Sequence, residues 1–161
     1  MESVSIRPMT PDDIPVVADW ITAVPLWQRY GLDAASVRSQ FEEALRQLDI
    51  LLVADLGAQN RACGFTWCLP DGGFGLSPYL KLIGVRQGLT GSGIGLALLS
   101  RTEDIASAIS TDMFLLVSDF NEGAQRFYRR HGYQQIGAVP GYVLPDVDEL
   151  IFWKRLRKAS V

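Results

Sequence analysis

The spacing most suggestive of chemistry belongs to four glycines that lie close together: Gly88, Gly91, Gly93 and Gly95. They fall between a predicted strand, Tyr79–Val85, and a helix predicted from about Gly93 to Ala108. Glycine lets the backbone approach a ligand closely and leaves N–H groups pointing outward. A helix N-terminus adds positive charge, so this segment is typical of an anion site, most often for phosphate. A purely structural turn is the alternative.

Two common phosphate-binding motifs do not fit this turn. A dinucleotide fingerprint needs a glycine at the sixth position of G-x-G-x-x-G, but that position is Leu96 counted from Gly91 and Leu98 counted from Gly93. A Walker A loop needs a Gly-Lys pair, and the sequence contains none. Nucleotide-binding folds of these two types are therefore disfavoured.

The elements that must position the turn alternate in the order β-α-α-β-β-β-α-β-α-β-β. Strands are predicted at Ser3–Arg7, Ile50–Asp55, Ala62–Leu69, Tyr79–Val85, Met113–Ser118, Tyr133–Val139 and Glu149–Leu156. Strands that come singly and in hairpins, with helices inserted, indicate an α/β (α+β) layered domain. We expect a mixed, mostly antiparallel sheet of about six or seven strands with helices on both faces.

Four local features complete this prediction. Thr10 is expected to cap the first helix, and the second is expected from Asp33 to about Leu48. Residues 25–31 are expected to form an aromatic-rich loop, and residues 71–75 a flexible connection. The continuous apolar run Met113–Ser118 predicts a strand that is buried on both faces.

Composition describes an ordinary globular chain. Its 161 residues and 17.8 kDa predict a single domain over residues 1–161, and 48% hydrophobic with 20% charged residues excludes disorder. A net charge of −3 argues against a nucleic-acid binder. That total combines −7 in residues 1–125 with +4 in residues 126–161, where Arg126, Arg129 and Arg130 follow at helical spacing. Either a solvated helix face or a local site for a phosphorylated ligand would explain the basic segment.

The sequence also indicates in which cellular compartment we expect the protein. No apolar run approaches the length of a membrane span, and the first residues do not look like a signal peptide. Cys63 and Cys68 fall in one predicted strand, about 16 Å apart and on opposite faces, so we expect them not to pair. Two free thiols fit a reducing cytoplasm.

The glycine turn resembles motif A of the GNAT superfamily of N-acetyltransferases. In that motif a strand with a small or apolar triplet leads to [RQ]-x-x-G-x-[GA] and a helix. Here the triplet is Ile83–Val85 and the turn is Thr90–Gly95. The departure is Thr90, where the family has Arg or Gln, so we expect one side-chain contact to pyrophosphate to be weaker or absent.

A second segment, Asp119–Tyr133, resembles motif B of the same family, N-x-x-A-x-x-[FLI]-Y-x-x-x-G-[FY]. The matching residues are Asn121, Ala124, Phe127, Tyr128, Gly132 and Tyr133. The order of elements also matches the family, so the resemblance covers nearly the whole chain. It implies a GNAT-like single domain.

The resemblance implies that acetyl-CoA is the cosubstrate, with no metal, and that it binds in a V-shaped opening between the strands Tyr79–Val85 and Met113–Ser118. It assigns to cofactor binding Ile83, Gly84 and Val85 for pantetheine, Thr90, Gly91, Ser92, Gly93, Ile94 and Gly95 for pyrophosphate, and Asn121 for the pantetheine arm. A main-chain N–H of the triplet would polarise the thioester carbonyl. Asn121 could equally be a plain helix cap.

The resemblance makes Tyr128 the catalytic acid that protonates the leaving thiolate, because a phenol with a pKa near 10 can serve this step. Tyr128 as a buried core ring is the alternative. Many family members carry a glutamate on the fifth strand, but that position is Leu116 here. Asp119 and Glu149 remain as bases that could act through a water, or the amine could arrive neutral.

The family's acceptor pocket is formed by the loop between the first two helices and by the final strand pair. That implies Trp27, Tyr30 and Tyr142 as substrate residues; packing beneath the loop is the alternative for Trp27 and Tyr30. The resulting prediction is a cytoplasmic acyltransferase. It would acetylate a primary amine of a small molecule, protein or peptide by direct attack in a ternary complex. A homodimer would be unsurprising, and the alternative is a non-catalytic acyl-CoA sensor or regulatory module.

Overall fold

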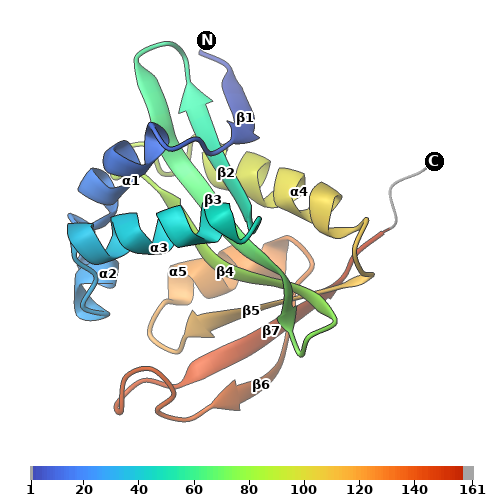
Figure 1. The fold of residues 1–161 in the computed structure, drawn as a ribbon. Coiled ribbons are helices and arrows are strands. Elements are labelled where there is room, and N and C mark those ends of the chain that lie inside the picture. The colour runs from blue at the N-terminus through green and yellow to red at the C-terminus, as the bar shows by residue number, and fades with distance from the viewer. Residues whose placement is uncertain (1, 158–161) are drawn as a thin grey trace. The chain divides into compact units, whose positions relative to one another are not determined.

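The computed structural model describes residues 2–157 and contains one seven-stranded sheet in the order β1-β2-β3-β4-β5-β7-β6 (Figure 1). The elements are β1 (Val4–Pro8), α1 (Asp13–Ile21), α2 (Pro25–Arg29), α3 (Ala34–Arg46), β2 (Ile50–Leu56), β3 (Asn60–Gly73), β4 (Ser77–Val85), α4 (Ile94–Ala106), β5 (Asp112–Ser118), α5 (Glu122–Arg130), β6 (Gln134–Val139) and β7 (Glu149–Arg155). β4 and β5 pair in parallel, whereas β1–β2, β2–β3, β5–β7 and β6–β7 are antiparallel. The predicted mixed, mostly antiparallel α/β sheet is confirmed.

The chain divides into two compact units. Within the described residues, unit 1 comprises residues 2–68 and 82–103, and unit 2 comprises residues 69–81 and 104–157. β3 and β4 each contribute residues to both units. The single domain over residues 1–161 stays a prediction, and its first residue and last four lie outside the described residues.

The core of unit 1 lies on one face of β3, because side chains alternate along a strand. Phe65 and Trp67 point to the face covered by α1 and α3. The Phe41 ring of α3 meets the Phe65 ring edge-on with centroids 5.4 Å apart, and the Trp20 ring of α1 lies 5.8 Å from Phe65. Aromatic pairs in this geometry add stability beyond the area that they bury.

The helix α4 packs closely against the opposite face of β3. A Cβ built on Gly64 would lie 2.8 Å from Ile94 Cγ2 and 2.9 Å from Leu98 Cδ1, so any larger residue would force these side chains to shift. Two residues further along β3, the buried hydroxyls of Thr66 and Thr102 are hydrogen-bonded at 2.9 Å. These contacts fix the helix that follows the glycine turn, and they therefore fix where that turn ends.

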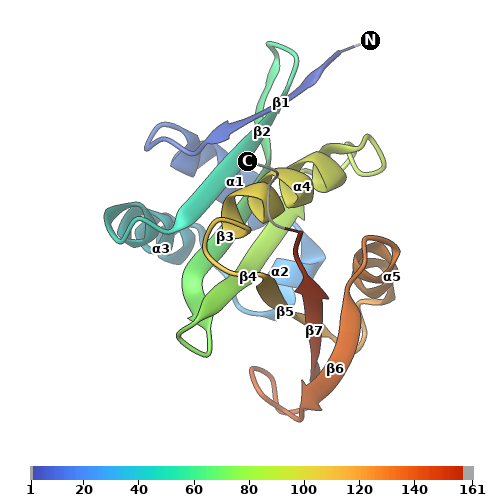
Figure 2. The ribbon, with the colours of Figure 1, turned by 90° about the vertical axis from the view of Figure 1, so that its right-hand side faces the viewer.

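Unit 2 is built on β5, β7 and β6, with α5 alongside β6 and β7 (Figure 2). The Tyr128 ring of α5 lies 5.6 Å from Tyr133 and 6.3 Å from the fully buried Phe152 of β7. Because Phe152 is paired with Leu115 across the sheet, the buried face of β5 is also the face toward α5. Burial along β5 alternates: Phe114 is only half-buried. The prediction that β5 is buried on both faces is therefore wrong.

Two segments predicted to be irregular have regular structure. The aromatic-rich segment after α1 forms the short helix α2, which Pro25 opens at its first position. β3 extends to Gly73 through the segment expected to be flexible, and the chain reverses at Phe74–Leu76. A hydrophobic pattern gives little signal for a strand that contains Gly72 and Gly73, but at both positions the backbone approaches neighbours too closely for a Cβ.

The predicted cap of α1 is also wrong. Thr10 does not cap the helix; its hydroxyl and its N–H donate instead to the Asp13 carboxylate, at 3.0 and 2.8 Å. Asp13 is buried and also receives the Arg7 guanidinium, with Nη1 to Oδ2 at 2.7 Å. Arg7 reaches Asp55 of β2 with its Nε, also at 2.7 Å. This ion-pair cluster ties β1, β2 and α1 together. In α3 the Asp33 side chain caps the helix by accepting the Ser36 N–H.

Candidate active site

The candidate anion-binding site lies in unit 1, where the end of β4 leads through the glycine turn into α4. Three glycines of the turn have left-handed backbone angles: φ is +91° at Gly88, +83° at Gly91 and +84° at Gly93. Residues with a side chain rarely adopt these angles. A Cβ built on any of the three would have no atom within 4 Å, so the backbone conformation and not crowding requires glycine.

Local hydrogen bonds shape the turn and leave its amides unused. The Arg86 N–H donates to the Cys63 carbonyl at 2.7 Å, and the Ser92 hydroxyl donates to the Leu89 carbonyl. Among residues 2–157, none of the backbone N–H groups from Gly91 to Leu96 finds an acceptor, and the first helical bond runs from Ala97 N–H to Gly93 O at 3.0 Å. Consecutive unbonded N–H groups at the start of a 13-residue helix form a cradle for an anion.

The Ile83–Val85 triplet lies directly before this turn in β4. A Cβ on Gly84 would lie 2.8 Å from the Phe65 ring and 3.4 Å from the Trp20 ring. The small residue therefore lets the strand pass over the aromatic core of unit 1. Thr90 is exposed, so an Arg or Gln there would also extend into solvent. The assigned contacts of the triplet and of Thr90 with the cofactor stay predictions.

Two of the predicted site residues, Asn121 and Tyr128, lie in unit 2, at the start and in the middle of α5. Asn121 caps α5: its side-chain oxygen accepts the Ala124 N–H at 3.2 Å. The cap interpretation is therefore confirmed. The Asn121 side-chain N–H groups are not used in the cap, and their contact with pantetheine stays a prediction.

Tyr128 is 5% exposed, and its ring belongs to the core of unit 2. Its hydroxyl has no hydrogen-bond partner in the described part of the chain. No fully buried side-chain oxygen there lacks a partner, so this hydroxyl reaches the surface. Burial, and secondarily the nearby Tyr79, raise the pKa of Tyr128 well above its usual range. The phenol thus keeps its proton at neutral pH and can donate it.

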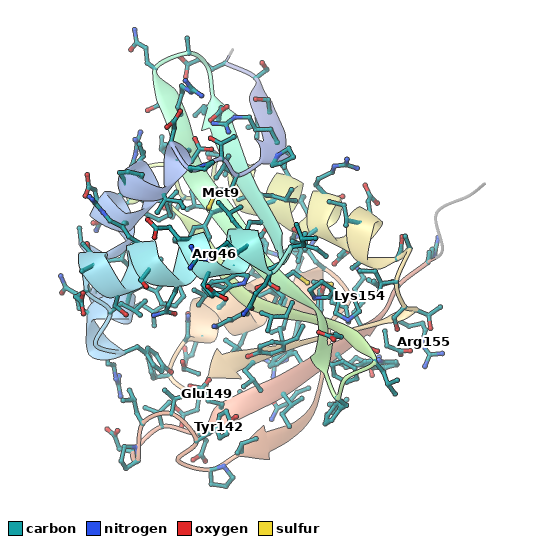
Figure 3. The ribbon with its side chains drawn as sticks, in the orientation of Figure 1. Met9, Arg46, Tyr142, Glu149, Lys154 and Arg155 are labelled. Carbon is teal, nitrogen blue, oxygen red and sulfur yellow. The ribbon has the colours of Figure 1, made fainter. Side chains whose placement is uncertain are left out.

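Tyr79 is a neighbour that the sequence did not single out. Burial raises its pKa to about 12, with smaller contributions from the charges of Glu149 and Tyr142. Glu149 opens β7 and is 5% exposed, whereas Tyr142 precedes β7 and is 63% exposed. Figure 3 shows Tyr142 and Glu149 near one end of β7, with Lys154 and Arg155 toward its other end. The burial of Glu149 could not be predicted from residue spacing.

The other candidate base, Asp119, has a structural partner. Its carboxylate accepts the Asp148 N–H at 3.1 Å, while the Asp119 N–H donates to the Asp148 carbonyl at 2.9 Å. Asp119 is exposed in the turn between β5 and α5. This reciprocal pair joins the turn to the segment before β7.

The basic residues of α5 have local partners. Arg126 lies 3.8 Å from Glu122, one turn earlier in the helix, and both side chains are exposed. The Arg129 guanidinium lies 5.2 Å from the centre of the Phe152 ring and donates to Gln135. These contacts favour the solvated helix face over a ribose phosphate site for these two residues.

The predicted acceptor residues fall in both units. Trp27 lies in α2 and Tyr30 caps it, and both are half-buried in unit 1. Tyr142 belongs to unit 2 and is exposed. Their roles toward a substrate stay predictions. Cys63 and Cys68 are buried and unpaired, as expected.

In the range of residues 2–157, no group of three or more histidine, cysteine, aspartate and glutamate side chains could hold a metal ion. No helix in this range is long and apolar enough to cross a membrane.

Comparison with known proteins agrees with this geometry. The sequence profile of the Acetyltransferase (GNAT) family matches residues 16–133. No curated protein sequence matches the chain. Several solved structures share the fold, which is what similarity at these low sequence identities shows.

Three of these structures illustrate the similarity. Ribosomal-protein-alanine N-acetyltransferase from Brucella melitensis has a TM-score of 0.76 at 20% identity, covering 94% of this chain and 99% of its own. The protein yncA from Salmonella typhimurium, solved with acetyl-CoA, has a TM-score of 0.75 at 17% identity, covering 98% and 96%. An aminoglycoside 6'-N-acetyltransferase complexed with coenzyme A has a TM-score of 0.76 at 15% identity, covering 98% and 99%.

Proposed function

This chain belongs to the acetyltransferase (GNAT) family, acyltransferases whose acetyl donor is acetyl-CoA, and we propose that it acetylates a primary amine by direct attack in a ternary complex. The observation that carries the proposal is the row of unbonded N–H groups from Gly91 to Leu96 at the start of α4. Such a cradle matches the doubly charged pyrophosphate of coenzyme A. The open space over Gly91 and Gly93 leaves room for it.

Different residues of the chain bind acetyl-CoA and take part in the chemical step. When bound, acetyl-CoA supplies the acetyl group as a thioester. The amides of the turn hold the pyrophosphate, and the Ile83–Val85 backbone holds the pantetheine arm and offers an N–H to the thioester oxygen. The Tyr128 hydroxyl, which is protonated and has no partner in the described residues, donates its proton to the departing sulfur.

The proposed acceptor is an amine of a small molecule or of a protein or peptide. One structural neighbour is an aminoglycoside acetyltransferase and another is a ribosomal-protein-alanine acetyltransferase, so both acceptor classes occur on this fold. The half-buried Trp27 and Tyr30 and the exposed Tyr142 would provide apolar contacts to the acceptor. We also propose a cytoplasmic location, because both cysteines are free. A homodimer and the absence of nucleic-acid partners remain part of the proposal.

A turnover assay across a panel of amines tests this function. Release of the free thiol of coenzyme A would be followed with polyamines, aminoglycosides, amino acids and peptides, each at saturating acetyl-CoA. We expect at least one amine to accelerate thiol release well above the rate in buffer. Acetyl-CoA binding without turnover on any amine would instead indicate the sensor or regulatory module, the alternative that the Thr90 departure favours. No acetyl-CoA binding by calorimetry would exclude both functions.

A further inference from the structure

The strand β6 of unit 2 lies at one end of the sheet, and one of its edges is not covered by another strand. β6 pairs with β7 on one side and is the last strand in the order of the sheet (Figure 2). Within residues 2–157, no backbone–backbone hydrogen bond outside the strand pairing involves residues 134–139. In an antiparallel pair, alternate N–H and C=O groups of each strand point away from the partner strand. Those groups of β6 are therefore open to a further strand.

The residues of β6 give this edge little protection against such pairing. Proteins commonly protect an exposed edge with charged residues or proline. The other end of the sheet, β1, contains Arg7 and Pro8, whereas β6 reads Gln-Gln-Ile-Gly-Ala-Val and contains neither a charge nor a proline. A register shift between Gln135 and Gly137 interrupts the pairing with β7 at Ile136, whose side chain is 54% exposed. This bulge therefore presents an aliphatic side chain to a partner and not a charge.

The helix α5 lies next to this edge and carries opposite charges at its two ends. The Arg129 guanidinium lies 5.2 Å from the centre of the Phe152 ring of β7 and donates to Gln135 of β6 at 3.2 Å, so α5 lies over these two strands. Glu122 is in the first turn of α5, whereas Arg129 and Arg130 are in its last turn. The three charged side chains are exposed. A partner that matches α5 must therefore present a basic end and an acidic end in the opposite order.

A second copy of this chain presents that order by symmetry. A twofold axis at the β6 edge makes the two β6 strands antiparallel and keeps both α5 helices on the same face of the continued sheet. The helices then run in opposite directions, so Glu122 of one protomer faces the partner's Arg130. Neighbouring strands are about 4.8 Å apart, so two helices that each lie over β6 and β7 would be about 10 Å apart. This separation is normal for packed helices.

We propose that two copies of this chain form a homodimer by pairing their β6 strands in antiparallel orientation, with their α5 helices side by side. Every residue of this interface belongs to unit 2. Because Ile136 lies near the middle of β6, the two copies of this side chain are buried near the twofold axis. The interface does not include the glycine turn. A monomeric protein would therefore be compatible with the proposed function, and a dimer without activity would be compatible with this interface.

Sedimentation velocity over a series of protein concentrations measures the dimer directly. We expect the wild type to change from the chain mass of 17.8 kDa at low concentration to twice that mass at high concentration. Ile136→Lys brings two like charges to the interface and removes two apolar contacts, so the dimer dissociation constant should rise roughly tenfold or more. The matched control is Ile109→Lys, because Ile109 is also an exposed isoleucine of unit 2 but lies in the turn after α4. Its dissociation constant should equal that of the wild type.

Two outcomes of the sedimentation series would overturn the interface. A wild type that stays monomeric at the highest concentration would exclude the homodimer. Equal dissociation constants for the wild type and Ile136→Lys would exclude β6 as the contact. Circular dichroism shows whether Ile136→Lys is folded, and the charge-reversal variants of α5 provide the decision if it is not.

Glu122→Arg, Arg130→Glu and the double variant test the contact between the two α5 helices. Each single substitution brings like charges of the two protomers together, so we expect the dimer dissociation constant to rise about three- to tenfold. The double variant restores opposite charges and should recover most of the affinity. Both substitutions oppose the dipole of their own helix, and these losses of helix stability add in the double variant, so they cannot produce the recovery. Losses of affinity that add in the double variant would overturn the α5 contact.

Hydrogen exchange of the backbone amides locates the interface without any substitution. The outward N–H groups of β6 are expected to exchange more slowly at high protein concentration than at low concentration, because the partner strand bonds them. The internal control is β1, the strand at the other end of the sheet, which should exchange equally at both concentrations. Equal exchange of β6 at concentrations where sedimentation shows monomer and dimer would overturn the pairing of the two strands.

Discussion

The predicted site residues divide into a backbone half in unit 1 and a side-chain half in unit 2. The backbone half consists of N–H groups that three left-handed glycines turn outward. The side-chain half is centred on Tyr128 of α5. A backbone site depends on the conformation of the chain. It therefore tolerates changes of side chain, such as Thr90 in place of the Arg or Gln of the family pattern. A side-chain site depends on single functional groups, so the two halves should respond differently to substitution.

The largest expected effect is on the side-chain half. Tyr128→Phe removes only a hydroxyl that has no protein partner within residues 2–157, so the thermal midpoint should change little. Loss of a general acid costs roughly a hundredfold or more in turnover. We expect kcat to fall by about that factor while the acetyl-CoA dissociation constant, measured by calorimetry, stays within about twofold.

Tyr133→Phe is the matched control, since it makes the same chemical change in the ring next to Tyr128. Its kcat should stay within about twofold of the wild type. Equal turnover by Tyr128→Phe and the wild type would remove Tyr128 as the acid and leave it as a core ring.

The second prediction separates the stability of unit 1 from its binding function. Burial alone would raise the pKa of Asp13, but hydrogen bonds from Arg7 and Thr10 outweigh it and lower the pKa from 3.8 to about 2. Because the folded-state pKa lies below the unfolded one, this contribution is present above about pH 4 and lost as the pH falls toward 2. The shift corresponds to about 2 kcal/mol of unfolding free energy at neutral pH.

Asp13→Asn should therefore lower the unfolding free energy by about 2 kcal/mol at pH 7 and flatten its dependence on pH between about 4 and 2. Urea denaturation at a series of pH values measures both. Acetyl-CoA affinity of the folded variant should not change, because Asp13 is held by Arg7 and Thr10 and not by the turn. An unchanged pH profile would show that the ion pair contributes no net stability.

The third prediction tests the backbone half. Gly93→Ala puts a side chain at φ +84°, which costs about 1–2 kcal/mol unless the turn changes its conformation. A turn that relaxes would redirect its N–H groups, so we expect the acetyl-CoA dissociation constant to rise roughly five- to thirtyfold with little change in kcat. Gly75→Ala is the control: it has φ +74° and equally open surroundings, but lies in the β3–β4 turn. Similar losses of affinity in both variants would contradict the cradle.

The smallest effect is expected at Thr90. Thr90→Arg restores a cation where the family pattern has one, on an exposed position next to the cradle. Exposed charge pairs contribute at most about 1 kcal/mol, so acetyl-CoA affinity should rise by about threefold at low salt and less at high salt. Thr90→Gln adds length without charge and should give a smaller gain. Weaker binding by Thr90→Arg would show that this side chain does not face the pyrophosphate.

Much of the fold could be predicted because its signals are local. The spacing of apolar residues and the helix cap at Asn121 predicted most elements, and the structure confirms that cap. The glycine turn was recognisable because Gly88, Gly91, Gly93 and Gly95 lie close together between a predicted strand and a predicted helix. By contrast, α2 is only five residues long and contains no fully buried residue, so no periodic pattern marks it.

The chemical environment of the site could not be predicted in the same way. Tyr79 and Glu149 are 70 positions apart, and only the pairing of β4 with β5 and of β5 with β7 brings them into one sheet. The sequence left two roles open for Asn121, a helix cap and a contact with the pantetheine arm. The hydrogen bond from the Ala124 N–H confirms the cap. Burial of Tyr128 in the core and its use as an acid are compatible, because its ring packs while its hydroxyl reaches the surface.

The division between a backbone half that binds and a side-chain half that reacts is tested most directly by one series of measurements. The acetyl-CoA dissociation constant and kcat would be determined side by side for the wild type, Gly93→Ala and Tyr128→Phe. We predict that Gly93→Ala loses affinity and keeps kcat, and that Tyr128→Phe keeps affinity and loses kcat. Parallel losses in both variants, or the reverse assignment, would contradict this division.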